Sequence, residues 1–180
     1  MIRAINLIIR SRLMLFIAIN LLSNFNAQTS NVGDIWITSP DHNPVHGESF
    51  LSTISVNLGS QPLGAYEISL NYVPSVVNIL GISPEAGSPF SSYTYSNSMG
   101  YHSGLTKIVA FQNSDMFAPI GVVEMCYVNF IAVGQAGESS VLGITVNIMS
   151  DTSGSNITAN PINGSVTINA STEVINWKLY

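Results

Sequence analysis

The amino-acid sequence predicts an all-β sandwich. Short apolar runs alternate with polar residues at a period of two, which turns one face of each strand to a core and the other to water. Gly, Pro, Asn and Ser separate these runs at roughly the spacing of strands in two-sheet sandwiches. After the N-terminal segment, no long stretch repeats its apolar residues at the helical period. Almost no helix is therefore expected outside that segment.

The first 27 residues have the composition of an export signal. Arg3, Arg10 and Arg12 precede the apolar run LMLFIAINLL, and a polar stretch follows it. This run is shorter than the roughly 20 residues that cross a bilayer. We therefore predict a signal peptide over residues 1–27, with an uncleaved membrane tether as the alternative. Either one predicts that the rest of the chain is extracellular or at the cell surface.

The first two strands are expected over residues 35–38 and 50–58. Pro40 follows the first strand, and the turn 46–48 leads into the second. In the second strand, the alternation turns three aliphatic side chains inward: Ile54, Val56 and Leu58.

The third strand has the clearest alternation in the chain. Its inward side chains are predicted to be Tyr66, Ile68, Leu70 and Tyr72. Pro74 ends this strand because it has no N–H group to donate to a sheet. The apolar run that follows predicts a fourth strand over residues 76–82.

The middle of the chain is less regular. Residues 83–103 are rich in Ser, Tyr and Gly, which predicts a long loop or a poorly buried pair of strands. Residues 105–111 and 122–133 are apolar on both parities, so both are predicted to be central strands. For the second of these, the favoured inward set is Cys126, Val128 and Phe130. The alternative inward set is Met125, Tyr127 and Ile131.

Two further strands complete the sandwich. One is predicted over residues 142–148, with Thr145 and Asn147 outside and four inward side chains: Leu142, Ile144, Val146 and Ile148. The last strand contains Val166 and Ile168. No internal repeat or linker divides residues 31–169, so one domain is expected.

Charge and motif content exclude several classes of function. From Gln28 onward the chain has two cations and ten carboxylates, a net charge of −8. Nucleic acid and anionic membrane surfaces are therefore not expected as partners. The chain has no Gly-x-Ser-x-Gly elbow, Cys/His nucleophile pair or phosphate-binding loop, so we predict that it is not an enzyme. Cys126 is the single cysteine and is expected to be a buried, inert thiol.

Two polar segments contain residue types that bind metals. Residues 41–48 include two imidazoles and two carboxylates, and residues 151–156 are rich in side-chain oxygen. Neither segment has a complete set of ligands. We interpret the first as a surface turn and the second as a plain hairpin, and we predict no metal site and no cofactor.

Three tyrosines offer a candidate site for carbohydrate: Tyr93, Tyr95 and Tyr101. Tyr93 and Tyr95 would share one face of a strand, and exposed aromatic rings provide flat surfaces on which sugar rings stack. The alternative is that these tyrosines cover one end of the sandwich with their hydroxyl groups toward water.

Three segments, taken in order, resemble cohesin modules. The first is LGAYEISLNYVPSVVNILGI at residues 63–82, which resembles the third and fourth cohesin strands, and the second is the Gly-Val strand with its aromatic end at residues 121–133. The third joins the Ser-Asp-x-x-Gly hairpin at 150–154 to the closing strand GSVTI at 164–168. This resemblance implies a nine-stranded jelly-roll sandwich over residues 32–169, followed by a tail or truncated linker at 170–180.

The resemblance also implies a binding site. In cohesins, one open sheet face binds the calcium-loaded dockerin module of a partner protein, and the third strand supplies polar side chains. The residues at these positions are Ala65, Glu67, Ser69 and Asn71. Glu67 stands where the family often has Asp, whereas Ala65 stands where type I members often have Asn. Val73 replaces the Asp that commonly precedes the proline.

The resemblance therefore implies an exported, non-catalytic module that docks a dockerin-type partner in an extracellular or cell-surface assembly linked to polysaccharide degradation. Any calcium is expected on the dockerin partner and not on this chain. Two alternatives are a carbohydrate-binding module that uses the tyrosines and a structural spacer of a surface protein.

Overall fold

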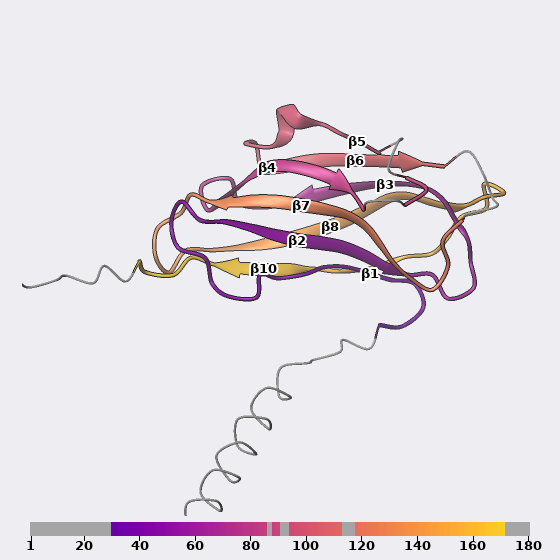
Figure 1. The fold of residues 1–180 in the computed structure, drawn as a ribbon, viewed down its shortest axis with the longest axis horizontal. Helices are drawn as coiled ribbons and strands as arrows, with labels where there is room; N and C mark the ends of the chain where they lie inside the picture. Colours follow the sequence, from indigo (N-terminus) through magenta and orange to yellow (C-terminus); the bar gives the residue numbers. More distant parts are fainter. Residues whose placement is uncertain (1–29, 86–87, 91–93, 113–117, 172–180) are drawn as a thin grey trace, which may run out of the picture. The chain divides into compact units, whose positions relative to one another are not determined.

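The described residues of the chain form two five-stranded β-sheets (Figure 1). The computed structural model describes residues 30–85, 88–90, 94–112 and 118–171. These residues hold the strands β1 (Asp34–Ile37), β2 (Ser49–Asn57), β3 (Leu63–Asn71), β4 (Val77–Pro84), β5 (Thr94–Ser96), β6 (Leu105–Phe111), β7 (Val122–Ala132), β8 (Ser139–Asp151), β9 (Asn160–Ile162) and β10 (Gly164–Thr167), and the short 3-10 helix η1 (Ser98–Gly100).

The order of the strands is that of a sandwich in which the chain crosses repeatedly between sheets. One sheet has the order β4-β7-β2-β1-β9 and the other the order β10-β8-β3-β6-β5. All pairs are antiparallel except β1 with β9. The predicted all-β jelly-roll sandwich is confirmed. The described residues contain ten strands where the resemblance implied nine, and β5 and β9 each span only three residues.

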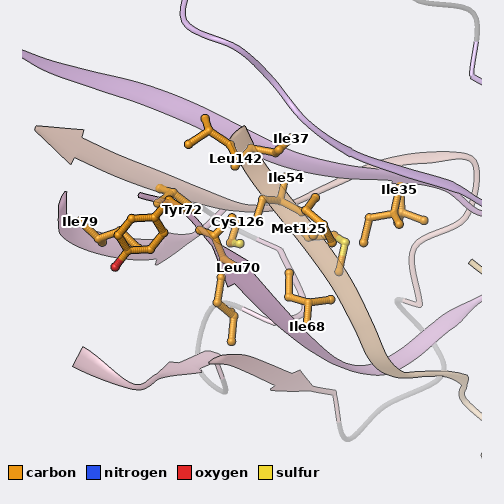
Figure 2. Packing of buried hydrophobic residues seen from close by; sticks show 14 of the residues in the cluster. Ile35, Ile37, Ile54, Ile68, Leu70, Tyr72, Ile79, Met125, Cys126 and Leu142 are labelled. Carbon is orange, nitrogen blue, oxygen red and sulfur yellow. The ribbon is translucent and has the colours of Figure 1, made fainter. Parts of the chain in front are cut away.

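The core lies between the inward faces of the two sheets (Figure 2). The inward residues predicted for β2 and β3 are all buried there: Ile54, Val56, Leu58, Tyr66, Ile68, Leu70 and Tyr72. Aromatic rings link the layers, because Phe130 of β7 stacks on Phe50 at 5.3 Å and meets the ring of Tyr72 edge-on at 6.0 Å. The buried hydroxyl of Tyr72 donates to the carbonyl of Gly100 at 2.8 Å, which satisfies a polar group in the core.

A β-bulge in β7 explains why neither parity of this strand is inward throughout. Ile54 of β2 pairs with Cys126, and Ser55 pairs with Glu124, so Met125 is an extra residue. Met125 and Cys126 are both fully buried. The favoured inward set, which contains Cys126, is confirmed from that residue onward, while Met125 of the alternative set is also inward.

A second bulge corrects the prediction for β8. Ile68 pairs with Val146 and Glu67 pairs with Ile148, so Asn147 is the extra residue. The extra residue reverses the alternation. As a result Ile148 is 55% exposed and Met149 is buried. The prediction that Ile148 faces the core is wrong.

Strand β6 is central in its sheet, as predicted, since it lies between β3 and β5, but only one of its faces packs on the core. Its inward residues Thr106, Ile108 and Ala110 are buried, but the outward Leu105 and Phe111 are 48% and 41% exposed. The outward face of β6 is open to solvent although three of its four side chains are apolar; the fourth is Lys107.

The segment 83–103 combines both predicted alternatives. Strand β4 continues to Pro84, and the short β5 pairs with β6. Between them, Phe90 is fully buried against Tyr66, with a ring separation of 5.5 Å.

The predicted signal peptide lies outside the described residues, and so do all but Ala170 and Ser171 of the predicted tail. Where the structure describes the chain, it contains no helix with the length and apolar character needed to cross a membrane.

Candidate functional site

The four residues predicted on the third strand lie together on the outward side of β3. They alternate with the buried Tyr66, Ile68 and Leu70, as expected for a strand with one face on the core. Neighbouring strands extend this surface on both sides. We call the surface the β3 face and define it as Ala65, Glu67, Ser69, Asn71, Tyr95, Leu105, Lys107, Val109, Phe111, Thr145, Asn147 and Ile148.

Strand register determines the neighbours on the β3 face. Glu67 lies between Val109 of β6 and Ile148 of β8. One step along β3, Ser69 lies between Lys107 and Thr145. Directly opposed side chains in an antiparallel pair are close enough to interact, so the polar residues of β3 have both polar and apolar neighbours.

A hydrogen-bonded polar cluster occupies the centre of the β3 face, formed by Glu67, Ser69, Lys107 and Asn147. Lys107 Nζ donates to Glu67 Oε1 at 2.8 Å, and Asn147 Nδ2 lies 3.2 Å from the same oxygen. Asn147 Nδ2 also donates to Ser69 Oγ at 2.8 Å. One carboxylate oxygen therefore receives two donors from the two strands that flank β3.

Sequence reasoning identified Glu67 and Ser69 of this cluster but not Lys107 or Asn147. The alternation of β6 places Lys107 opposite the buried parity, but only the strand order brings it beside β3. The alternation of β8 likewise places Asn147 outside, but only the strand order brings β8 beside β3.

The ion pair lowers the pKa of Glu67 below its usual value of 4.5. The hydrogen bond from Lys107 is the main cause; partial burial of the carboxylate opposes it, and the positive charge of Lys107 and the hydrogen bond from Asn147 add to the lowering. The Glu67 side chain is 24% exposed and that of Lys107 is 58% exposed. Glu67 is therefore ionised at neutral pH, and its charge is balanced within the chain.

Apolar side chains flank the polar cluster on both sides. On one side, the rings of Tyr95 and Phe111 stack with 6.4 Å between centroids and 19° between planes, beside Val109. We call Tyr95, Val109 and Phe111 the aromatic flank; Tyr95 is 60% exposed. On the other side, Ile148 stands outward on β8.

The structure separates two of the three tyrosines predicted for carbohydrate. Tyr95 lies on the β3 face, whereas Tyr101 packs against the core and its hydroxyl group hydrogen-bonds Ser96. Tyr93 lies outside the described residues. Tyr101 therefore does not share an exposed surface with Tyr95, and Phe111 stands beside Tyr95 instead.

The two polar segments that were considered for metal binding are hydrogen-bonded turns. His42 Nε2 lies 2.8 Å from Glu48 Oε1, and His46 Nδ1 lies 3.0 Å from the carbonyl oxygen of Gly134. Asp151 Oδ1 accepts from the backbone N–H groups of Ser153 and Ser155. Among the residues that the structure describes, no three His, Cys, Asp or Glu side chains gather as metal ligands.

The thiol of Cys126 is fully buried, as predicted. Burial raises its pKa to about 12, because the apolar core disfavours the thiolate. Nucleophilic chemistry at this residue is not expected at neutral pH.

Solved cohesins have the same fold at low sequence identity. A cohesin module of a family 33 glycoside hydrolase from Clostridium perfringens matches with a TM-score of 0.64 and 16% identity, over 79% of this chain and 100% of that chain. A non-cellulosomal cohesin from Archaeoglobus fulgidus matches with a TM-score of 0.63 and 17% identity, over 79% and 94% of the two chains.

A third match is the cohesin of the OlpA–Doc918 cohesin–dockerin complex from Clostridium thermocellum, with a TM-score of 0.63 and 13% identity over 77% of this chain and 99% of that one. No protein-family model matches the chain, and no curated protein matches it. The fold of this chain is thus the cohesin fold.

Proposed function

We propose that this chain is a non-catalytic binding module whose β3 face docks a dockerin module of a partner protein. One observation carries the proposal: within a cohesin fold, the strand β3 presents an open outward face. Similar cohesins have been solved in complex with a dockerin from Clostridium thermocellum and, for a cohesin of Acetivibrio cellulolyticus, with a mutant of the Cel5 dockerin.

The chemistry of the β3 face supports a protein partner. Tyr95, Phe111 and Ile148 are exposed to 60%, 41% and 55%. The centre of a protein interface is typically rich in aromatic and large apolar residues with few charges. The β3 face matches this composition in its aromatic and large apolar side chains and its low charge, although its one ion pair lies at the centre with the apolar side chains on both sides.

A titration with dockerins tests the proposal. The full chain is mixed with Doc918, the Cel5 dockerin and CaDoc0917, with calcium and then with a chelator, in a calorimeter. We expect a calcium-dependent complex with at least one of them, at a dissociation constant of about 1 μM or below. Heat signals that are absent with all three, or unchanged by the chelator, would count against a dockerin partner.

The β3 face is tested in the same titration with a matched pair of variants. Ile148→Lys places a charge on the face, whereas Leu51→Lys places one on the outward side of β2 in the other sheet, where Leu51 is 58% exposed. We expect Ile148→Lys to weaken the complex at least about tenfold, because a lysine must be desolvated in the interface. Leu51→Lys is expected to bind as the wild type does.

We propose further that the chain is exported and acts outside the cell or at its surface, in an assembly linked to polysaccharide degradation. The arginines and the apolar run of residues 1–27 support export. Expression in a secreting host, followed by N-terminal sequencing, tests this part. A mature N-terminus at Gln28 is expected; an intact N-terminus in the membrane fraction would favour the tether.

Carbohydrate binding is a second candidate, and the near-parallel, exposed rings of Tyr95 and Phe111 favour it. Flat aromatic surfaces of this kind stack on sugar rings. Native gels cast with a panel of polysaccharides test it, and Tyr95→Ala is expected to restore free mobility in a gel that retards the wild type. Unchanged mobility in every gel would refute it. Negative results for both candidates would leave the structural spacer.

A further inference from the structure

Building on the proposed function, we propose that the β3 face selects an amphipathic helix whose contact surface is uncharged, with Lys107 and Ile148 as the specificity-determining residues. Lys107 neutralises the charge of Glu67 within the chain. Ile148 provides an apolar anchor on the other side of the polar cluster from the aromatic flank.

The β3 face carries one positive and one negative side chain, which balance each other. Glu67 and Lys107 are the two formally charged side chains of the β3 face, and they pair with 2.8 Å between Nζ and Oε1. Lys107 is also the only Lys or Arg in the described part of this acidic chain. A basic partner residue would meet a carboxylate that is already paired, and an acidic one would meet an ammonium group that is already paired, with the Glu67 carboxylate 2.8 Å from it. Burying either charge without a partner is costly, so an uncharged contact surface is favoured.

The apolar side chains on the two sides of the β3 face are about one helix diameter apart. Val109 on β6 and Ile148 on β8 lie on opposite sides of Glu67. Two strand spacings separate β6 from β8, about 9.6 Å, which is close to the diameter of a helix with its side chains, about 10 Å. A helix lying along β3 would therefore contact both sides and cover the polar cluster between them.

A partner strand fits this surface less well. Strand β3 already pairs with β6 on one side and β8 on the other, so its backbone has no free edge. Strand addition needs unpaired N–H and C=O groups. Side-chain contact with a helix needs none, because a helix satisfies its own backbone groups.

Ile148 is exposed only because β8 is bulged. Without the reversal at Asn147, the alternation that runs through Leu142 and Ile144 would turn Ile148 into the core. Asn147 faces outward with or without the bulge, and its amide donates to Glu67 and Ser69. The bulge thus adds Ile148, the second apolar anchor, beside a polar residue that the alternation already exposes.

A synthetic library tests this inference without a natural partner. Three-helix bundles with one randomised helix face are selected against the immobilised full chain, against Lys107→Met and against Ile148→Lys, with Leu51→Lys as the control. From the wild type we expect helices with apolar, uncharged contact faces. These helices should lose at least about tenfold in affinity for Ile148→Lys and retain their affinity for Leu51→Lys.

The salt dependence gives a second readout. Affinity of the wild-type binders should change by less than about twofold between about 50 mM and about 500 mM NaCl. Helices selected on Lys107→Met should carry Lys or Arg at the centre of the contact face, and salt should weaken them by about tenfold or more.

The inference is overturned if wild-type binders carry central charges as often as those selected on Lys107→Met. It is also overturned if no selected helix is weakened by Ile148→Lys. Failure of the dockerin titration together with success of this selection would refute the dockerin partner and leave the recognition chemistry of the β3 face intact. The reverse pair of results would do the opposite.

Discussion

Glu67 lies at the centre of the β3 face, and its Oε1 atom accepts hydrogen bonds from Lys107 and Asn147. Each donor comes from a different neighbouring strand, so the carboxylate is held on both sides. These hydrogen bonds favour the ionised form of Glu67, and Lys107 balances its negative charge without a partner protein. At the scale of single residues, the chemistry that a partner meets is therefore set by Lys107 as much as by Glu67.

Replacing Lys107 by Met should raise the pKa of Glu67 toward 4.5, because the main hydrogen bond and the nearby positive charge are both lost. Carboxyl-detected NMR titrations of the wild type and the variant measure the change. Glu48 is an internal control, since its lowered pKa depends on the backbone N–H of Val45 and on His42. An unchanged pKa of Glu67 in the variant would show that Lys107 does not lower it.

At the scale of elements, bulges decide which side chains reach the surface. The extra residues Met125 in β7 and Asn147 in β8 each reverse the alternation of their strand. One reversal leaves two consecutive side chains in the core, and the other exposes Ile148. Strand β3 meets β8 at a further irregularity between Leu63 and Ala65, where the two backbones come close.

Gly64 at that irregularity is expected to tolerate no side chain. A Cβ atom there would collide with the backbone carbonyl of Asp151, and neither strand can shift without disturbing the ladder. Gly64→Ala should therefore lower the free energy of unfolding by about 1–3 kcal/mol, measured by urea denaturation.

Gly81→Ala on β4 is the matched control, because no atom lies within 4 Å of a Cβ at that position. Its free energy of unfolding should stay within about 0.5 kcal/mol of the wild type. Equal destabilisation by the two substitutions would contradict a steric cause at Gly64.

At the scale of the whole molecule, several carboxylates of this acidic chain accept hydrogen bonds in the folded state and stabilise it. Asp34 accepts from Asn160 and from the backbone of Asn31, which ties β1 to β9. Hydrogen bonds likewise lower the pKa of Glu48, Glu67 and Asp151. Each of these groups prefers its charged form in the folded state.

Acid should therefore destabilise the molecule. For a carboxylate with a lowered folded-state pKa, the stabilisation is present above the unfolded values of 3.8 for Asp and 4.5 for Glu. It is lost as the pH falls through the lower folded-state values. We expect Tm to fall between about pH 5 and about pH 2, measured by circular dichroism.

Glu67→Gln provides the control for this prediction, since Gln cannot titrate. Its Tm should fall less than that of the wild type over the same range of pH. A wild-type Tm that is constant from neutral to strongly acidic pH would contradict the role given to the four carboxylates.

Only some residues of the β3 face could be placed from the sequence. Alternation in β3 was enough to place Ala65, Glu67, Ser69 and Asn71 outward, because one-sided burial leaves a period of two. The resemblance to cohesins then selected that face as the candidate site. Lys107 and Phe111 were missed as site residues, because an apolar strand open on one side has the same composition as one covered on both.

By itself, the sequence determined the fold class, the inward faces of β2 and β3 and the acidic charge, since these depend on local pattern and composition. Only the tertiary structure decided which strands lie beside β3, where β7 and β8 bulge, and that Ile148 and the aromatic flank face solvent. Strand pairing and bulges depend on contacts between residues far apart in the chain. No local pattern records those contacts.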